Sequence, residues 1–283
     1  MRDQVPLLNQ ANITTMCDMN EEKSQGKSWH EFICNADDIK RFAEIFKVSE
    51  KHMAVCTYLT ARRKYYPALS NACLIVNRGI VCGGDRFEKD FYKTILKLET
   101  PVGSYDDNDV PIPTEAFAIY VILNPKDTFK ALATSMPKCA ETISDGREIP
   151  NAYKVFRTEL PNTVSRHNKY KQIDIDTKDY SNILDLDSFF ESLQFTPLLT
   201  VETHGGFHIV YDTASPNIKE LHKRFYEFRQ TTQFTKPSSD GKMVKDYWFS
   251  ITKEAMVILP GTFQGGFQTR IISIRDWVHD NTP

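Results

Sequence analysis

Two aspartates separated by one residue, Asp174 and Asp176, stand in the segment Lys171-Gln-Ile-Asp-Ile-Asp176. The alternation of apolar and polar residues predicts a strand, on which residues two apart point to the same face. Two neighbouring carboxylates repel each other unless a cation neutralises them, and hard Mg²⁺ or Mn²⁺ prefers such oxygen ligands. The pair therefore indicates a metal site. The alternative is a pair of hydrated carboxylates at a sheet edge.

A second Asp-x-Asp sequence, Asp185-Leu-Asp187, shows that this motif alone is not specific. It adjoins a helix expected near residues 188–194. We therefore interpret Asp187 as the N-cap of that helix and not as a metal ligand.

A β-hairpin is predicted in Val201-Glu-Thr-His-Gly-Gly-Phe-His-Ile-Val-Tyr211, where two β-branched and aromatic runs flank a pair of glycines. Gly205 and Gly206 lack a Cβ and have access to positive φ, so their backbone amides could approach an anion. Thr203 adds a hydroxyl, and His208 adds a donor suited to a phosphate oxygen. The alternative is a β-turn in which His208 is only a half-buried polar residue.

A third carboxylate would complete a metal site, and two candidates follow the hairpin. Glu254 precedes the apolar run Ala255–Leu259, so a neighbouring strand could bring it to the face of the aspartate pair. Asp246, which precedes Tyr247-Trp-Phe249, is the alternative. We expect Glu254 to be the ligand and Asp246 to be its first replacement.

Two further segments could contact a nucleotide or a nucleic acid. The second glycine-rich turn, Pro260–Phe267, and the residues after it supply polar groups that suit the second wall of a nucleotide pocket; otherwise the segment is a loop. The basic segment Ala61–Pro67 combines cationic and aromatic side chains, which suits a template strand or a triphosphate; otherwise it is a solvated strand end. The candidate contacts are Thr262, Gln264 and Arg270 in the first segment and Arg62, Arg63 and Lys64 in the second.

In their order along the chain, these motifs resemble those of the archaeo-eukaryotic primase superfamily of primase-polymerases. The matching features are an Asp-x-Asp pair at a strand end, a Gly-Gly-x-His hairpin, and an acidic residue that leads through an apolar strand into Pro-Gly-Thr. The resemblance covers about residues 170–274, and residues 1–150 match only in their expected αβ layout. Glu254 departs from the aspartate that the superfamily often has in its third motif.

The resemblance implies template-directed nucleotidyl transfer by a primase-polymerase core. Asp174, Asp176 and Glu254 would bind Mg²⁺ or Mn²⁺, and His208 with Thr203 and the two hairpin glycines would hold the outer phosphates. The implied partners are an NTP or dNTP, a single-stranded template or primer, and other replication proteins, with no membrane. Two alternatives stay open: a non-catalytic primase-like nucleic-acid-binding module, and another metal-dependent phosphotransferase or nuclease.

The helices and strands expected to position these residues indicate an α+β fold with a mostly antiparallel second half. We expect a flexible leader over residues 1–30, an N-terminal αβ module over 31–150 and a catalytic module over 151–283, the two modules forming one compact unit. The resemblance implies an RRM-like sheet with helices in the second module. Strands are expected at 53–58, 72–81, 116–123, 170–176, 255–259 and 269–274, and helices at 36–48, 87–98, after 127, near 188–194 and from 215.

Composition narrows the class of protein. The chain has 283 residues, 41% of them hydrophobic, and a net charge of −2, so any polyanion must be bound by a local basic patch. Six scattered cysteines without a Cys-x-x-Cys pair argue against a zinc site and for a reducing compartment. We expect no signal peptide and no membrane span, and we place the protein inside the cell, in the cytoplasm or the nucleus or in a host cell if it is viral.

Overall fold

The computed structural model describes residues 28–144, 151–163, 168–237, 243–252 and 254–282. The part of the chain so described is an α+β protein, and every strand pair in it is antiparallel. Most of the predicted leader, residues 1–27, lies outside the described residues. No described helix is long and apolar enough to cross a bilayer.

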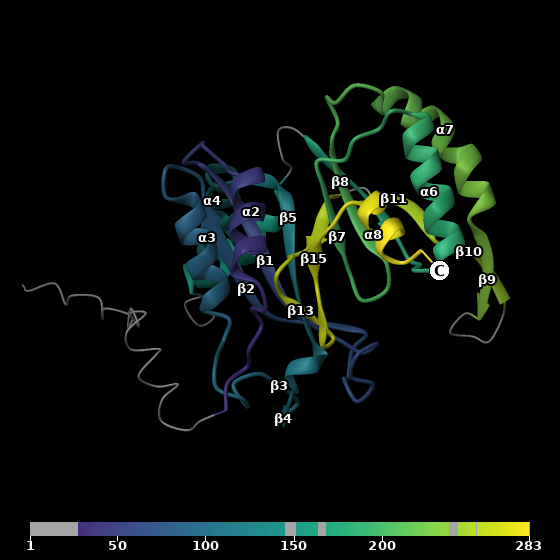
Figure 1. Ribbon diagram of the computed structural model, residues 1–283. Helices are drawn as coiled ribbons and strands as arrows, with labels where there is room; N and C mark the ends of the chain where they lie inside the picture. Colours follow the sequence, from purple (N-terminus) through teal and green to yellow (C-terminus); the bar gives the residue numbers. More distant parts are fainter. Residues whose placement is uncertain (1–27, 145–150, 164–167, 238–242, 253, 283) are drawn as a thin grey trace, which may run out of the picture.

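A four-stranded sheet with the order β12-β5-β1-β2 forms one half of the molecule (Figure 1). Its longest strand, β5, is apolar on both faces because helices cover both, as the unbroken apolar run predicted. Helices α2 and α3 pack on one face, and helices α4 and α5 lie at the other. The elements are α2 (Ala36–Ile45), β1 (Met53–Arg62), β2 (Cys73–Cys82), α3 (Phe87–Leu96), β5 (Phe117–Asp127), α4 (Thr128–Ser144), α5 (Ala152–Glu159) and β12 (Met256–Ile258).

A five-stranded sheet with the order β11-β6-β8-β7-β15 forms the other half. One face packs against α6, α7 and α8, and the other face contributes Leu199, Val201 and Val210 to the core of the four-stranded sheet. The elements are β6 (Tyr170–Ile175), α6 (Tyr180–Ser192), β7 (Leu199–Glu202), β8 (Phe207–Asp212), α7 (Ile218–Thr231), β11 (Phe249–Thr252), β15 (Arg270–Ile271) and α8 (Ile274–Asp280).

Short elements complete the described chain. Three two-stranded ribbons and two 3-10 turns lie in the connections. They are β3 (Asp106–Asp107) with β4 (Val110–Pro111), β9 (Gln233–Pro237) with β10 (Met243–Tyr247), β13 (Phe263–Gln264) with β14 (Phe267–Gln268), and the turns η1 (Thr114–Ala116) and η2 (Leu160–Asn162).

The two predicted modules are interleaved and not consecutive. Strand β12, from the C-terminal part of the chain, forms the edge of the N-terminal sheet by pairing with β5. The buried Asn124 side chain also joins the two sheets, because it donates to the Tyr170 carbonyl at 3.0 Å and accepts from the Tyr170 amide at 2.9 Å. The division at residue 150 therefore does not separate two cores.

Two local predictions were wrong, the end of the strand at residue 123 and the N-cap at Asp187. Asn124-Pro125 does not end β5, because Pro125 falls at an irregularity in the pairing with β1 and needs no ladder hydrogen bond. Pro137 lies inside α4, which continues to Ser144. Asp187 lies inside α6, whose N-cap is Asp179, since the Asp179 carboxylate accepts from the amide of Asn182 at 3.2 Å. Helix α4 begins after residue 127, as expected, and Asp127 caps it by accepting from the amides of Phe129 and Lys130.

Candidate functional site

Asp174 lies near the end of β6, on the side that the alternation predicted, and Asp176 follows directly after the strand. Ile173 and Ile175 are buried in the core beneath α6 and α7, so Asp174 points to the opposite face of the sheet. Asp174 is about one third exposed, and Asp176 is exposed just beyond the strand. The sheet therefore presents this carboxylate pair to solvent next to the four-stranded sheet.

His208 is directly beside Asp174, because β6 and β8 pair with these two residues in register. Its Nδ1 accepts a hydrogen bond from the backbone amide of Ile258 at 3.1 Å, so Nδ1 carries no proton. The proton of the neutral ring is then on Nε2, which lies 3.3 Å from Oδ1 of Asp174 and donates to it. His208 thus links the edge of one sheet to the carboxylate of the other.

Two cations from the four-stranded sheet face the aspartates. Arg62 ends β1 and Lys64 follows it, and both are close enough to influence the ionisation of Asp174. Burial by itself would raise the pKa of Asp174, but the hydrogen bond from His208 and the charges of Lys64 and Arg62 lower it below its ordinary value. Burial also lowers the pKa of Lys64, assisted by Arg62, while Asp176 and Asp174 act in the opposite direction.

The lowered pKa of Asp174 leads to a prediction about acid stability. A carboxyl whose pKa is depressed by folding contributes stability above its unfolded value, taken as 3.8, and loses it as the pH falls through the folded value. We therefore expect wild type to lose more unfolding free energy than Asp174→Asn when the pH is lowered below 3.8. Urea unfolding of both proteins at a series of pH values measures the difference. An equal loss in both proteins would contradict the assignment.

The structure does not bring Glu254 to the aspartate pair. Its carboxylate instead binds the buried ammonium of Lys126 at 2.5 Å. Glu254 lies before β12 and precedes Ile258, whose amide contacts His208, by four residues. Asp246, the alternative, lies on the β9–β10 ribbon opposite Phe234, outside the five-stranded sheet (Figure 1). Within the described ranges no three His, Cys, Asp or Glu side chains form a metal-binding group.

The strands on either side of Asp174 explain why a third carboxylate is missing there. In the pairing registers, Ser250 on β11 and His208 on β8 occupy the two positions beside Asp174. Neither side chain is acidic. The donor set at this point of the sheet is therefore two carboxylates, one imidazole and a hydroxyl-bearing neighbour.

The hairpin glycines differ from each other and from the prediction. Neither Gly205 nor Gly206 has a positive φ. Gly205 is exposed and has open space around its missing Cβ, whereas a Cβ on Gly206 would lie 1.7 Å from the carbonyl oxygen of Ile175. Gly206 is thus required for close packing of the hairpin on β6, and Thr203 is buried beside it, with its amide bonded to the Gly206 carbonyl.

The second glycine-rich turn mainly supports the hairpin. Its three glycines, Gly261, Gly265 and Gly266, all have positive φ, and the last two form the tip of the β13–β14 ribbon. Thr262 is buried and donates to the Leu259 carbonyl, and Gln264 accepts from the amide of His204 at 2.7 Å. Arg270 binds the buried Glu202 at 2.6 Å, which it shares with Lys178. The three predicted contacts are therefore engaged within the protein.

The three cationic residues predicted in the basic segment do not all face the same way. Arg63 turns away and donates to the carbonyls of Leu69 and Ser70. Arg62 donates to the Tyr120 hydroxyl at 2.5 Å, and Lys64 lies 4.9 Å above the centre of the Tyr65 ring. Of the three predicted residues, Arg62 and Lys64 face the candidate site.

An aromatic cluster that the sequence reading missed surrounds the hairpin tip. The exposed His204 ring lies 5.6 Å from the Tyr65 ring and 6.1 Å from the Phe267 ring. Lys178 lies 4.0 Å above the Phe267 ring. Tyr65 belongs to the basic segment already singled out, but nothing local in the sequence pairs it with His204 or Phe267, because the three come from different sheets and turns.

A cavity of about 390 Å³ adjoins the site on the outer face of the four-stranded sheet. Arg62, Arg78, Tyr58 and Tyr120 line it, and Glu254 lies on its wall. The guanidinium of Arg78 lies 5.9 Å from the centre of the Tyr58 ring. The size of the cavity and its mixture of aromatic and cationic side chains suit a nucleotide.

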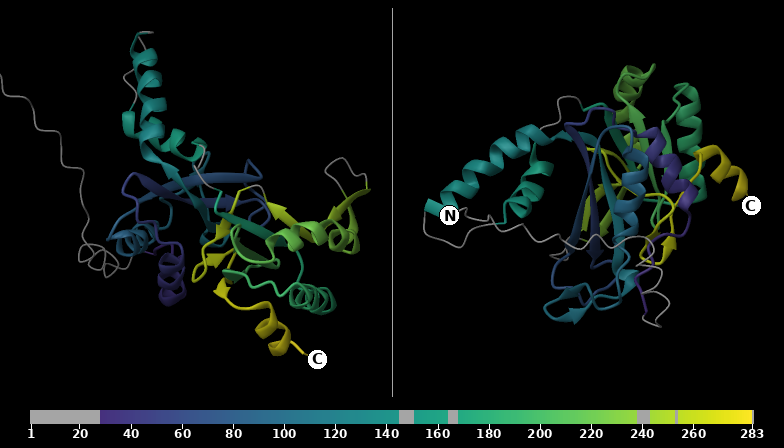
Figure 2. Two further views of the ribbon diagram at one scale, coloured as in Figure 1. Left: turned by 90° about the horizontal axis from the view of Figure 1, so that it is seen from above. Right: turned by 90° about the vertical axis from the view of Figure 1, so that its left-hand side faces the viewer.

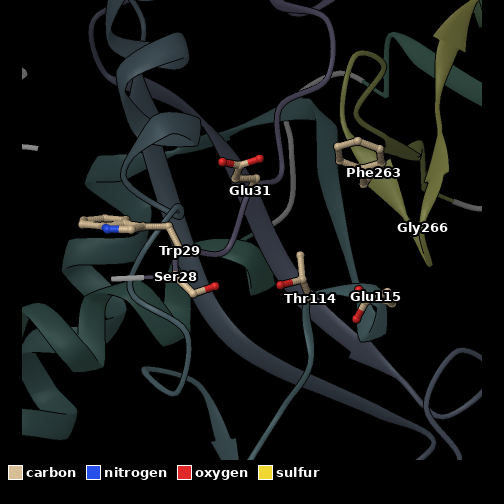
Figure 3. Close-up of a pocket in the computed structure, with 7 residues that line it drawn as sticks. All are labelled: Ser28, Trp29, Glu31, Thr114, Glu115, Phe263 and Gly266. Atoms are coloured by element: carbon tan, nitrogen blue, oxygen red, sulfur yellow. The ribbon is translucent and has the colours of Figure 1, made fainter. Parts of the chain in front are cut away.

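A second, larger hollow has no cationic side chain among its described lining residues. It measures about 740 Å³, and the residues drawn around it in Figure 3 come from the start of the described chain, from η1 and from the β13–β14 ribbon. Two glutamates and two aromatic rings stand among its described lining residues, which include no residue predicted to do chemistry. The lining residues are Ser28, Trp29, Glu31, Thr114, Glu115, Phe263 and Gly266.

Comparison with known proteins adds nothing to the resemblance to primases, which rests on the sequence motifs alone. A scan against protein-family models and searches of curated proteins and of solved structures found no match to this chain.

Proposed function

We propose that this protein is a metal-dependent nucleotidyltransferase that extends or primes a nucleic-acid strand. One observation carries the proposal: the Asp174–Asp176 pair of one sheet meets Arg62 and Lys64 of the other, with His208 between the sheets. Carboxylates beside two cations, one of which, Arg62, also lines a nucleotide-sized cavity, suit phosphoryl transfer better than covalent catalysis.

The order of elements supports an RRM-like catalytic module. Apart from the β9–β10 ribbon inserted before β11, the chain runs β6-α6-β7-β8-α7-β11. These strands take the order β11-β6-β8-β7 with both helices on one face. In a βαββαβ unit of this kind the face without helices is available for function, and here part of that face packs against the four-stranded sheet through Leu199, Val201 and Val210. Asp174 and His208 lie on that face.

The residues fit a divalent cation only in part. Mg²⁺ is commonly held by one or two carboxylates together with waters and substrate phosphates, a set that Asp174 and Asp176 could provide. The cation would lower the negative charge on the reacting phosphate. In this proposal Arg62 and Lys64 bind the outer phosphates, and His208 holds Asp174 in its ligating orientation instead of binding phosphate directly.

Primer extension tests the proposal most directly. We expect lengthening of a labelled primer on a single-stranded template with NTPs or dNTPs in Mg²⁺ or Mn²⁺, and no lengthening in EDTA. Shortening of the labelled strand would favour a nuclease. Binding without either change would favour the second candidate.

The second candidate is a non-catalytic nucleic-acid-binding module, and the position of Glu254 favours it. Because Glu254 is neutralised by Lys126, the site has two carboxylates where the resembled superfamily has three acidic positions. The same cations and aromatic rings would then bind a single strand without chemistry. Metal binding to the aspartate pair discriminates between the two candidates.

Both candidates predict that Lys64 contributes to single-strand binding. Lys64→Gln should weaken binding of a labelled oligothymidylate and reduce the slope of log affinity against log salt concentration by about 0.7, the value for one lost phosphate contact on a single strand. Lys89→Gln, an exposed change of equal charge on α3, is the matched control. Fluorescence anisotropy at several salt concentrations measures both slopes, and equal effects of the two variants would refute a local role for Lys64.

A further inference from the structure

Helix α4 projects from the body of the protein with α5 beside it (Figure 2, teal). Its inward side buries only Ala131 and Ser135. Four large apolar side chains on its outward side are 48–69% exposed: Phe129, Leu132, Met136 and Ile143. Monomeric proteins rarely leave a contiguous apolar surface of this kind uncovered.

The spacing of these side chains identifies the kind of partner. Phe129, Leu132, Met136 and Ile143 follow intervals of three, four and seven residues, which is the repeat by which one helix packs against another. Ala133 and Ala140 continue the same exposed stripe and allow a close approach of helix backbones. The stripe of residues 129–143 therefore suits a helix.

The stripe is complementary to itself. If two copies of α4 pack antiparallel with Met136 at the two-fold axis, Phe129 opposes Ile143 of the second copy and Leu132 opposes Ala140. Large side chains then meet smaller ones, and each contact occurs twice. A parallel arrangement would instead place Phe129 against Phe129 and Ala140 against Ala140.

Charge on the flank of the stripe agrees with the antiparallel arrangement. Lys130 and Glu141 are eleven residues apart, about three helical turns, so they lie on one flank of α4. Both are exposed, and among the described residues neither has an ion-pair partner within the chain. In the antiparallel pair Lys130 faces Glu141 of the second copy at both ends.

We propose that the stripe on α4 is a homodimer interface, formed by antiparallel packing of α4 against α4 of a second copy. This inference is independent of the proposed nucleotidyl transfer. A single pair of helices buries a small interface, so the dimer should form at micromolar and not at nanomolar concentrations.

Sedimentation velocity of the full chain over a concentration series tests the interface. We expect wild type to shift from monomer to dimer, and Leu132→Glu or Met136→Glu to weaken dimerisation by at least about 30-fold, the effect of losing one central contact. Val110→Glu, at an apolar residue that is 54% exposed elsewhere, should leave the dimer unchanged. Circular dichroism should show that all variants stay folded, since the substituted side chains are on the surface.

Charge reversal tests the orientation. Lys130→Glu and Glu141→Lys should each weaken the dimer, and the double variant should restore it, because the pair is reversed at both ends. A wild-type protein that stays monomeric at high micromolar concentration would overturn the proposal, as would an equal effect of Val110→Glu. Failure of the double variant to restore the dimer would overturn the antiparallel arrangement.

Discussion

Replacement of Asp174 by asparagine should lower nucleotidyl transfer by at least about 1,000-fold, in the range seen when a group that stabilises the transition-state charge is lost. The amide oxygen can still accept the proton of His208, so the link between the sheets survives. What is lost is the negative charge that a cation requires. Because the charges of Lys64 and Arg62 are then no longer neutralised by Asp174, binding of the nucleotide without metal should not weaken.

Asp176→Asn should have an effect of the same order, since either change leaves the cation with one carboxylate. Asp185→Asn is the matched control, because it alters an exposed aspartate in the second Asp-x-Asp sequence, on helix α6. Primer-extension rates of the three variants, measured beside equilibrium binding of the nucleotide, separate catalysis from binding. Persistence of extension in both Asp174→Asn and Asp176→Asn would exclude this pair as the catalytic site.

The sequence was sufficient to predict those features of the fold and the site that depend on a local pattern of residues. Alternation in Ile173-Asp-Ile-Asp176 placed the isoleucines in a core and Asp174 on the opposite face, because side-chain direction on a strand depends only on parity. The hairpin around Gly205 and Gly206 was predicted for the same reason, as its two runs and its turn lie within eleven residues. The pairing of Asp174 with His208 then follows once β6 and β8 are neighbours.

The sequence was insufficient to predict which residues meet when their positions depend on the register between distant strands. Parity puts Met256 and Ile258 on one face of β12, and Glu254 comes just before the strand, but only the pairing of β12 with β5 shows which of these residues comes nearest to the aspartates. That position is held by Ile258, whose amide binds His208, while Glu254 lies beside Lys126. Register between strands more than a hundred residues apart is fixed by the packed sheet and leaves no local signal.

The roles of the two hairpin glycines could not be predicted from the sequence either, because they too depend on tertiary packing. From sequence, the pair at positions 205 and 206 suggested two equivalent anion-binding amides with positive φ. In the structure only Gly206 is constrained, and its constraint is the distance to a neighbouring strand. A close approach of two backbones is a property of the tertiary structure, so it cannot be read from a Gly-Gly sequence.

This difference predicts opposite outcomes for two adjacent alanine substitutions. Gly206→Ala should destabilise the protein by about 3 kcal/mol, because its Cβ would lie 1.7 Å from the Ile175 carbonyl oxygen and 3.0 Å from the Thr177 amide nitrogen, so backbone must move. Gly205→Ala should leave stability within about 0.5 kcal/mol of wild type, since no atom lies within 4 Å of its Cβ. Urea unfolding of the two variants measures both free energies.

The clash at Gly206 should affect the candidate site as well as the stability of the protein. Ile175 and Thr177 flank Asp176, so any shift that relieves the clash displaces that carboxylate and loosens the pairing of Asp174 with His208. Gly206→Ala should therefore also lower metal-dependent activity under conditions in which the variant is still folded, and Gly205→Ala should not. If Gly206→Ala were as stable and as active as Gly205→Ala, the hairpin would not pack on β6 as described, and the site built on that contact would fail with it.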